Sequence, residues 1–489
     1  MNLTCDVAVI AAGPAGLAAA IAAAEKEKKV IVFEKAAVTG GTANMGMGPF
    51  AVESHFQKDM MENLTVEKAF EDYMRETRWH VDARLVKNYF EKSGDTISWL
   101  EDMGVKFAGA NKYFPGSHRT WHMVLPEDGG FPGPRSAGTM CKRMTERAAE
   151  LGVEIHTETP VKKILKEDGK ITGVVAVDKT GAEISCSAKA VIIATGGFGN
   201  NVEMIKENTG YTYGTDIFNF RIPGVDGDGL KMAWEAGAGK GRMSMEKITH
   251  LVAGVKNDMF LPLSNIFNQP NLIVNLEGHR VMNEELMENT SYASNVVDIQ
   301  KDRRIFSILD KRIIGAYKRN GVDVPNDMTK MFGDIVAYFE EMMPKAVEAA
   351  PESMIIAGSI EELAEKMGCP YEELKKTIDE YNELCEDNWD SVFGKDRRFL
   401  RPIDTAPFYA AAISIGAYGS LGGILIDSDL RVLTEDHIPI PGLYGAGSDV
   451  NDIYDGSYVF TFPGNTMGFA LNSGRMAGEN AAEFIENDV

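Results

Sequence analysis

The chain opens with a short apolar segment, a helical segment and a second apolar segment. Residues 6–10 (DVAVI) form a nearly continuous hydrophobic run, which predicts a buried parallel strand. An alanine-rich helix follows Gly13 and Gly16 and reaches Lys28, and residues 30–34 (VIVFE) predict a second strand. This strand–turn–helix–strand order is typical of a dinucleotide-binding βαβ unit.

Two further buried strands are predicted far downstream, at 190–197 (AVIIATGG) and 442–447 (GLYGAG). Both are expected to join the same sheet. The sequence between them includes charged helical sequence at 359–386, with Ser359 as a predicted N-cap. We therefore predict an α/β protein. A discontinuous Rossmann-like domain would comprise 1–245 and 419–489, and an inserted α+β domain would comprise 246–418.

Composition and charge narrow the possible partners of this 489-residue chain. A net charge of -22 argues against nucleic acid or an anionic membrane as a partner, because both would be repelled. The five cysteines are widely spaced, which argues against an iron–sulfur motif, a c-type haem motif and a disulfide framework. No metal site, membrane span or leader segment is expected from the sequence, and we predict a cytoplasmic protein.

The first candidate ligand motif is AAGPAG at 11–16. Ala11 stands where a GxGxxG motif has its first glycine, whereas Gly13 and Gly16 keep the other two. Glu34 ends the second strand, where a carboxylate accepts a hydrogen bond from a ribose 2′-hydroxyl and disfavours a 2′-phosphate. The predicted dinucleotide contacts of this unit are Ala12, Gly13, Pro14, Ala15, Gly16, Glu34 and Lys35.

Further glycine-rich segments follow in a fixed order: 40–49 (GGTANMGMGP), 194–197 (ATGG) and 442–450 (GLYGAGSDV). Together with the first motif, this set resembles the FAD-binding fold of the fumarate reductase/3-ketosteroid dehydrogenase superfamily. The resemblance implies FAD as the cofactor. It also implies that the helix opening in 462–484 points its positive N-terminal dipole at the flavin N1–C2=O edge. The additional predicted FAD contacts are Gly40, Gly41, Thr42, Met47, Gly48, Ala194, Thr195, Gly196, Gly197, Gly447, Ser448, Asp449, Gly464, Asn465 and Thr466.

The resemblance extends over the whole chain, including 93–107, 226–238, 278–285 and 404–411. Members of this superfamily fold as an FAD domain with an inserted capping domain, and the substrate lies between the two against the flavin. The resemblance therefore implies that residues 246–418 form a capping domain that covers a small-molecule alkene.

Several positions depart from the fumarate reductase pattern. Arg280 matches the arginine of the GxRxxNE segment, but the proton-donating arginine eight residues later is replaced by Glu288. Thr461 replaces the arginine that clamps the substrate carboxylate, and Tyr418 replaces a histidine. His250 is the candidate for the histidine of the HPT segment. Because a buried carboxylate without a cation costs several kcal/mol, fumarate is a poor candidate substrate, as is urocanate if its carboxylate needs the same clamp.

The 3-ketosteroid dehydrogenase pattern also fits incompletely. Those enzymes place tyrosines where this chain has Phe462 and Glu288. We therefore predict an ene-reductase acting on a neutral enone, either steroid-like or aromatic. Reduced FAD would supply a hydride from N5, and an acidic side chain would supply the proton.

Several residues compete for the remaining chemistry. Glu288 is the preferred proton donor, Tyr292 and Tyr418 are alternatives, and a solvated position at a helix start is the competing interpretation of Glu288. The carbonyl could be polarised by the backbone of 464–466 or by the hydroxyls of Tyr418 and Tyr458. Predicted catalytic residues are Glu288, Tyr418, Tyr292, Arg280 and His250, with Arg280 as a structural or proton-path residue rather than a direct ligand. Predicted substrate-binding residues are Tyr458, Thr461, Phe462 and Gly464.

The segment around His118, Arg119 and His122 is expected to be a structured surface loop, with a substrate or phosphate contact as the alternative. Alternative functions are the reverse dehydrogenase reaction, an acrylate-type reduction with a clamp such as Arg119, and an electron-relay flavin subunit. The sequence contains no second dinucleotide motif. The electron donor is therefore expected to be transiently bound NAD(P)H or a separate reductase.

Overall fold

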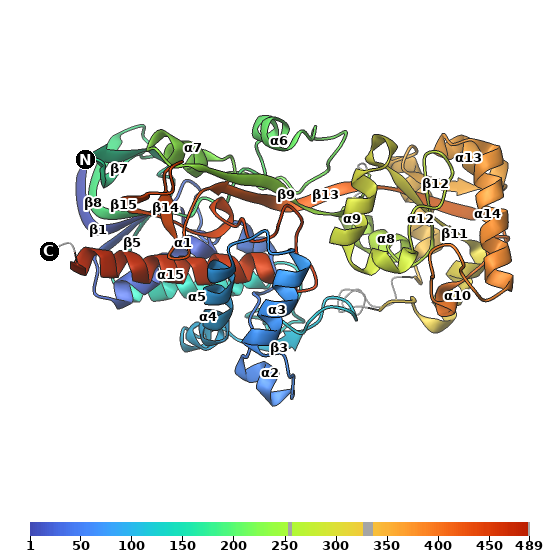
Figure 1. Cartoon of the computed structure of the whole chain (residues 1–489), viewed down its shortest axis with the longest axis horizontal. Coiled ribbons are helices and arrows are strands. Elements are labelled where there is room, and N and C mark those ends of the chain that lie inside the picture. Colours follow the sequence, from blue (N-terminus) through green and yellow to red (C-terminus); the bar gives the residue numbers. More distant parts are fainter. Residues whose placement is uncertain (253–256, 326–335, 488–489) are drawn as a thin grey trace.

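The computed structural model describes residues 1–252, 257–325 and 336–487, and the side chains of 257–261 are not considered. Two lobes lie side by side along the long axis of the molecule (Figure 1). The larger lobe contains both chain termini and the smaller lobe contains the middle of the chain. Long strands β9 (Lys240–Leu251) and β13 (Phe408–Ile424) run between the lobes (Figure 1).

The core of the larger lobe is a sheet in the order β14-β15-β8-β1-β2-β5, extended by β6 and β7. Strand β1 pairs in parallel with both β2 and β8, and β15 pairs in parallel with β8. The predicted joining of three separated segments into one sheet is thereby confirmed. Its strands are β1 (Asn2–Ile10), β2 (Val30–Phe33), β5 (Glu154–His156), β6 (Val161–Glu167), β7 (Lys170–Val177), β8 (Glu183–Ile193), β14 (Arg431–Leu433) and β15 (Pro439–Gly445).

Helices α1 (Pro14–Glu25) and α15 (Asn465–Asn487) lie side by side in this lobe (Figure 1). A Cβ atom at Gly474 or Gly478 would come within 2.1 Å of Ala15 O and 2.3 Å of Ala19 O, respectively. These two glycines therefore permit backbone-to-backbone packing of the helices. The other elements of the lobe are the hairpin β3 (Phe107–Asn111) and β4 (Trp121–Val124), the helices α2 (His55–Asp59), α3 (Val66–Glu76), α4 (Ala83–Asp102), α5 (Ala137–Glu150), α6 (Val202–Thr209) and α7 (Asp228–Glu235), and the short η1 (Gly41–Met45) and η5 (Gly447–Asp449).

The second sheet has the order β10-β11-β13-β12, and β9 also pairs with β13. Both predicted domain boundaries, at 245/246 and 418/419, fall inside the continuous strands β9 and β13. The β9–β13 register shifts between Ala417 and Ser420, next to the second boundary. The remaining elements here are β10 (Leu272–Asn275), β11 (Ile305–Asp310), β12 (Met354–Ala357), α8 (Asn257–Phe267), α9 (Thr290–Asp298), α10 (Lys311–Asn320), α12 (Phe339–Ala349), α13 (Ile360–Met367), α14 (Tyr371–Glu386), η2 (Glu284–Glu288), η3 (Lys301–Arg303) and η4 (Arg397–Phe399).

The charged stretch 359–386, which the sequence predicts to be helical, forms two helices, α13 and α14. Ser359 caps α13 as predicted, because its hydroxyl accepts a hydrogen bond from Glu362 N at 3.1 Å. Gly368 then adopts φ 69°, and Pro370 precedes the next helix. The left-handed glycine and the proline end the first helix, which the hydrophobic pattern alone did not indicate.

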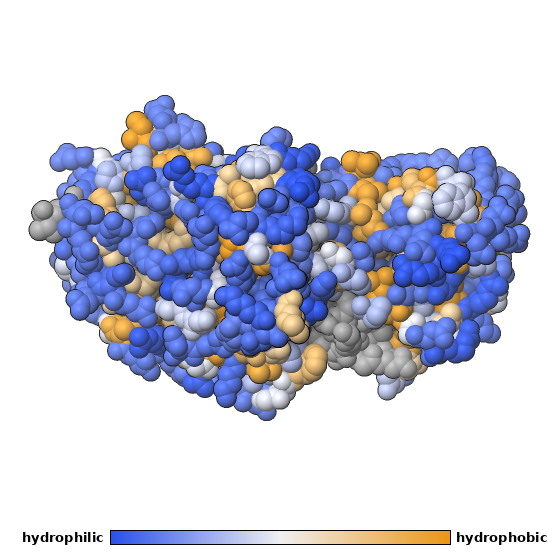
Figure 2. Space-filling view, turned by 60° about the horizontal axis from the view of Figure 1, so that its bottom comes forward, coloured by the Kyte–Doolittle hydropathy of each residue, from blue (hydrophilic) through white to orange (hydrophobic). Residues whose placement is uncertain are grey.

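Hydrophobic side chains on the face seen in Figure 2 form separate small patches within a largely hydrophilic surface. Large apolar residues such as Trp79, Phe131 and Trp389 are exposed. Among the described residues, no helix combines the length and apolarity that a bilayer crossing requires. The same residues contain no cluster of His, Cys, Asp and Glu suited to a metal ion.

Candidate active site

The first βα turn has an open backbone surface. Ala11 adopts φ 84°, the left-handed conformation that the usual first glycine permits. No atom lies within 4 Å of the position that a Cβ of Gly13 would occupy, whereas a Cβ at Gly16 would lie 1.9 Å from Ala11 O. The turn therefore leaves room for a ligand at Gly13 and needs Gly16 for its own packing. Pro14 begins α1, where its missing N–H costs nothing.

Glu34 is buried and is held by the backbone. Its two carboxylate oxygens accept hydrogen bonds from Ala12 N and Ala36 N, each at 2.7 Å. Each oxygen retains a second lone pair, so the carboxylate can also accept from a ribose hydroxyl. Lys35, by contrast, forms ion pairs with Asp226 at 3.0 Å and Asp228 at 2.6 Å, and its predicted cofactor contact stays a prediction.

The segment that contains Thr42, Met47 and Gly48 runs next to this turn. Gly40 and Gly41 adopt φ 98° and 50°, and the missing Cβ of Gly41 lies 3.2 Å from Gly13 Cα. A Cβ at Gly48 would lie 1.9 Å from His122 O. These glycines bring backbone against backbone beside the open turn.

Asp449 joins two of the other predicted segments. It is fully buried and accepts hydrogen bonds from the Thr195 hydroxyl at 2.9 Å and from Gly197 N at 2.9 Å. Burial raises the pKa of Asp449, while these donors and Gly196 oppose the shift. The segments 194–197 and 447–449 are thereby fixed together after parallel strands β8 and β15, at the sheet edge where α/β folds bind ligands. Ala194 and Ser448 lie in these segments.

The start of α15 also carries features of a ligand site. Gly464 adopts φ 85° and its carbonyl accepts a hydrogen bond from Phe50 N at 2.8 Å. Asn465 is fully buried, and its Oδ1 accepts from the Tyr89 hydroxyl at 3.0 Å. Its Nδ2 has no hydrogen-bond partner among the described residues. An unpaired buried donor at a helix N-terminus fits an acceptor-rich ligand such as a flavin.

Taken together, the open turn at Gly13, the buried carboxylate of Glu34 and the free amide of Asn465 fit FAD. The turn would hold the pyrophosphate at the N-terminus of α1, and Glu34 would hold the ribose. When bound, FAD supplies hydride chemistry at N5.

Aromatic residues gather beside the loop that leads to α15. Tyr113 lies 4.5 Å from Phe460 between ring centroids, and Tyr458 lies 5.2 Å from Tyr454 and 5.6 Å from Phe460. Tyr418 is 42% exposed. Burial nevertheless raises its pKa, and Tyr113 is its hydrogen-bonding neighbour.

Phe462 packs inside the protein and does not line the candidate substrate site. It is fully buried and contacts the rings of Phe50, Tyr73 and Phe90. In the described structure Phe462 therefore exposes no surface that a substrate could contact. Its burial among these rings is typical of a core residue. The ring of His118 covers it at 4.4 Å.

Glu288 and Tyr292, from the smaller lobe, lie next to residues of the larger lobe. The Thr461 hydroxyl donates a hydrogen bond to the Glu76 carboxyl, and Tyr292 is a second hydrogen-bonding neighbour of Glu76. Burial raises the pKa of Glu76 and, together with Glu76, that of Tyr292. Glu288 ends η2 beside Gly116, whose Cβ would lie 3.2 Å from Glu288 Oε1. Burial and the nearby Glu285 also raise the pKa of Glu288.

Arg280 is engaged elsewhere. It is nearly buried, donates to Glu284 at 2.7 and 2.8 Å and to Asp390 at 2.9 and 2.7 Å, and holds the pKa of Asp390 well below its usual range. These buried ion pairs give Arg280 a structural role. His250 hydrogen-bonds to Leu251 O, and its ring stacks on Phe218 at 6.5 Å. Burial lowers the pKa of His250.

The expectation of a surface loop is wrong for His122. This side chain is fully buried and forms a hydrogen bond to the Ser54 hydroxyl at 2.6 Å. Burial lowers the pKa of His122 to about 4, so it is neutral near pH 7. Strand β4 carries this histidine inside, whereas His118 and Arg119 are half-buried in the preceding loop.

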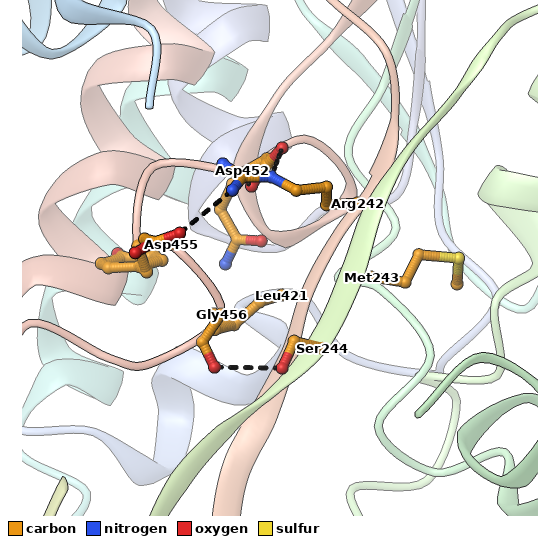
Figure 3. A pocket seen from close by; sticks show the side chains of 9 residues that line it. Arg242, Met243, Ser244, Leu421, Asp452, Asp455 and Gly456 are labelled. Carbon is orange, nitrogen blue, oxygen red and sulfur yellow. Dashed lines mark hydrogen bonds and ion pairs between the residues drawn. The ribbon is translucent and has the colours of Figure 1, made fainter. Parts of the chain in front are cut away.

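A polar pocket of about 400 Å³ opens beside the loop between η5 and α15 (Figure 3). Arg242 from β9 forms ion pairs there with Asp452 at 2.9 Å and Asp455 at 3.2 Å (Figure 3). Ser244 donates to Gly456 O at 3.1 Å. These contacts anchor the loop that carries Tyr454 and Tyr458 to the strand that links the lobes.

Sequence reasoning missed Glu246, a residue of β9 that is only 2% exposed. Its carboxyl accepts a hydrogen bond from the Thr466 hydroxyl, and burial raises its pKa to about 7. The signal that could have found it is that Glu246 is the single acidic residue of the strand Lys240–Leu251 and lies next to Met245. Glu76 and Tyr113 were missed too, because no local pattern distinguishes them.

A family model described as an FAD binding domain matches residues 6–461. The chain belongs to the fumarate reductase/3-ketosteroid dehydrogenase family of FAD flavoproteins. This confirms the predicted fold class, the FAD cofactor and the enzyme class, an FAD-dependent oxidoreductase acting on CH–CH groups.

Relatives differ in what they reduce. The vinyl phenol reductase of Lactiplantibacillus plantarum is 31% identical, over 98% of this chain and 96% of its own length. The NADH:fumarate oxidoreductase of Klebsiella pneumoniae is 27% identical over 98% of this chain, which spans only 48% of that flavoprotein. In structure, a flavocytochrome c3 fumarate reductase in an open conformation matches with a TM-score of 0.70 and 25% identity, over 99% of this chain and 79% of that one.

A 3-ketosteroid-Δ4-(5α)-dehydrogenase from Rhodococcus jostii RHA1, in complex with 4-androstene-3,17-dione, has the same fold. It matches with a TM-score of 0.75 and 23% identity, over 98% of this chain and 97% of that one.

Proposed function

We propose that this flavoenzyme reduces a C=C bond conjugated to a carbonyl in a neutral, apolar substrate. The observation that carries the proposal is the pair of Thr461 and Glu76. By the family resemblance, Thr461 stands where fumarate reductases place a carboxylate-binding arginine. In the described part of the chain, neither Glu76 nor Glu288 pairs with a lysine or an arginine. A carboxylate bound here would meet acids instead of cations.

The aromatic surroundings support the same substrate class. The half-buried ring of Tyr113 packs on the buried ring of Phe460, which packs in turn on the buried ring of Tyr458. Tyr418, which is 42% exposed, is the hydrogen-bonding neighbour of Tyr113. Rings of this kind stack on aromatic or polycyclic substrates, and a tyrosine hydroxyl can donate to a carbonyl. Glu288 or Tyr292 would supply the proton that accompanies the hydride.

A vinyl phenol is a second candidate substrate, favoured by the similarity over nearly the full length of the vinyl phenol reductase. Loss of the phenol proton and protonation of the terminal carbon turn such a molecule into a carbonyl conjugated to C=C. Both candidates therefore ask the protein for the same chemistry, which is an acidic group near an apolar ring.

The test is to photoreduce the holoenzyme without oxygen and to follow flavin reoxidation by different acceptors. Neutral enones, steroid enones and 4-vinylphenol should reoxidise the flavin quickly, whereas fumarate, acrylate and cinnamate should not. Reoxidation by carboxylates alone would contradict the proposal. If no acceptor reoxidises the flavin, the result favours an electron-relay subunit. If saturated ketones reduce the oxidised flavin, the result favours the reverse reaction.

The electron donor is tested separately. NADH and NADPH would each be added to the oxidised holoenzyme without oxygen. Direct flavin reduction within seconds supports a nicotinamide donor, and its absence supports a separate reductase.

A further inference from the structure

Glu246 lies between Thr466, a predicted flavin contact, and the strand segment that carries Tyr418, a predicted catalytic residue. It lies on β9, and its Oε1 accepts the hydrogen bond from Thr466 in the first turn of α15. On its other side, Oε2 lies 3.7 Å from the position of a Cβ at Gly419, next to Tyr418 in β13. The Glu246 carboxyl thus lies against two elements. One is the start of α15, which fits the flavin, and the other is the part of β13 where the register shifts and where Tyr418 is exposed.

The environment of this carboxyl favours its protonated form. The side chain is 2% exposed, and in the described residues it has neither an ion-pair partner nor a hydrogen bond besides that of Thr466. Burial raises its pKa to about 7, and the Thr466 hydrogen bond opposes the shift. A carboxyl of this kind changes its charge near neutral pH when another charge appears close by.

The titratable groups that face Glu246 are phenols. Tyr418 approaches from β13, and Tyr454 and Tyr458 approach from the loop before α15. The charged neighbour on its own strand, Lys247, is paired with Asp298 at 2.9 Å. His250, further along β9, hydrogen-bonds to Leu251 O. None of these phenols is ionised near pH 7, because burial raises the pKa of each.

We propose that Glu246 is a proton-storing residue that binds a proton when the flavin is reduced and releases it when substrate reoxidises the flavin. A reduced flavin carries negative charge at its N1–C2=O edge, and the N-terminus of α15 is the site that fits this edge. A second negative charge on Glu246, in contact with that helix start through Thr466, is disfavoured in a dry environment. Electron uptake therefore draws a proton onto the carboxylate.

Electrons and protons balance over one catalytic cycle. NAD(P)H or a separate reductase provides two electrons. Formation of the anionic reduced flavin consumes one proton, and the Glu246 carboxylate takes up a second. Alkene reduction breaks one C=C π bond and forms two C–H bonds, one from the hydride and one from the proton of Glu288 or Tyr292. The Glu246 proton then replaces the proton that this donor has lost, and Glu246 is a carboxylate again. Only this last step depends on the proposed function, because proton uptake on reduction involves no substrate.

Redox potentiometry of the holoenzyme across pH 7 to 9 tests the idea. Wild type should take up close to two protons per two electrons at about pH 8, where Glu246 is a carboxylate while the flavin is oxidised, and Glu246→Gln should take up close to one. Glu246→Asp keeps a carboxyl and should restore the second proton in part. Glu288→Gln is the matched control, since it removes an acid of the smaller lobe and should leave the proton count at that of wild type.

Equal pH dependence of the potential in wild type and Glu246→Gln would overturn the proposal. Loss of the second proton in Glu288→Gln alone would also overturn it. Because Glu246→Gln can fail to fold or to bind FAD, an infrared difference spectrum of wild type provides a second measurement. Reduction should produce a carboxylic acid C=O band that shifts in heavy water, and absence of such a band would refute proton storage. A negative acceptor panel would refute the proposed function and leave these results unaffected.

Discussion

Thr461 donates its hydroxyl hydrogen to the carboxyl of Glu76, across 385 positions of sequence. Glu76 comes from α3 and Thr461 from the loop before α15. By the family resemblance, Thr461 stands where fumarate reductases place an arginine that binds a substrate carboxylate, and we propose that the pair lies at the substrate site. Acceptor selectivity should therefore depend on both residues together.

Thr461→Arg alone should not create a fumarate reductase, because Glu76 would form a salt bridge with the new arginine. The double variant Thr461→Arg/Glu76→Gln frees the guanidinium and should raise the rate of flavin reoxidation by fumarate at least about tenfold over either single variant, a gain of about 1.4 kcal/mol. Stopped-flow reoxidation with both single variants as controls measures this gain. Equal rates in all three variants would show that the position does not contact the substrate.

Gly13 and Gly16 should respond differently to the same substitution. Gly13→Ala adds a methyl group where no protein atom lies within 4 Å, so the protein should fold with reduced FAD content. Gly16→Ala places its methyl 1.9 Å from Ala11 O and should destabilise the fold by about 1–3 kcal/mol. Flavin absorbance per chain and urea unfolding separate the two effects. A Gly13→Ala variant with full FAD content would place the pyrophosphate elsewhere.

Arg280 should matter for stability more than for chemistry. Removing it leaves the buried carboxylate of Asp390 without its cation and leaves Glu284 with Lys395 alone, at 3.3 Å, which costs about 3–5 kcal/mol. Arg280→Met should therefore lower the urea midpoint strongly, while the folded fraction keeps turnover within about tenfold of wild type. Arg280→Lys retains the charge and should lose less stability. A variant with normal stability and abolished turnover would instead give Arg280 a direct role.

Stability should fall with rising pH because of Glu246. Its pKa is raised to about 7 in the folded protein from 4.5 when unfolded, so the folded state binds more protons between these values. The stabilising contribution is complete below about pH 4.5 and is lost as pH rises through about 7, about 3 kcal/mol in total. Unfolding of wild type and Glu246→Gln in excess FAD should therefore converge below about pH 4.5, diverge between about pH 4.5 and 7, and keep a constant difference at higher pH, with the glutamine variant less sensitive to pH. Parallel curves would mean that Glu246 does not titrate.

Local sequence determined the ligand-binding backbone of this protein. The turn at 11–16, the acid at 34 and the capped helix start at Ser359 all depend on residues a few positions apart, so their patterns were sufficient to predict them. The order of the glycine segments also led to the sheet, since buried parallel strands are continuous hydrophobic runs. Within the helical stretch 359–386, Gly368 and Pro370 separate α13 from α14, which again depends on residues close together in the sequence.

Tertiary structure decided the chemistry of the acids. Glu246 meets Thr466 across 220 positions, and His122 meets Ser54 across 68, so no local pattern gives their burial or their pKa. Phe462 and Arg280 have the residue types of a substrate site, but packing and ion pairing assign them to the core. Backbone conformation follows from neighbours in sequence, whereas the cost of a buried charge depends on atoms that only the folded chain brings together.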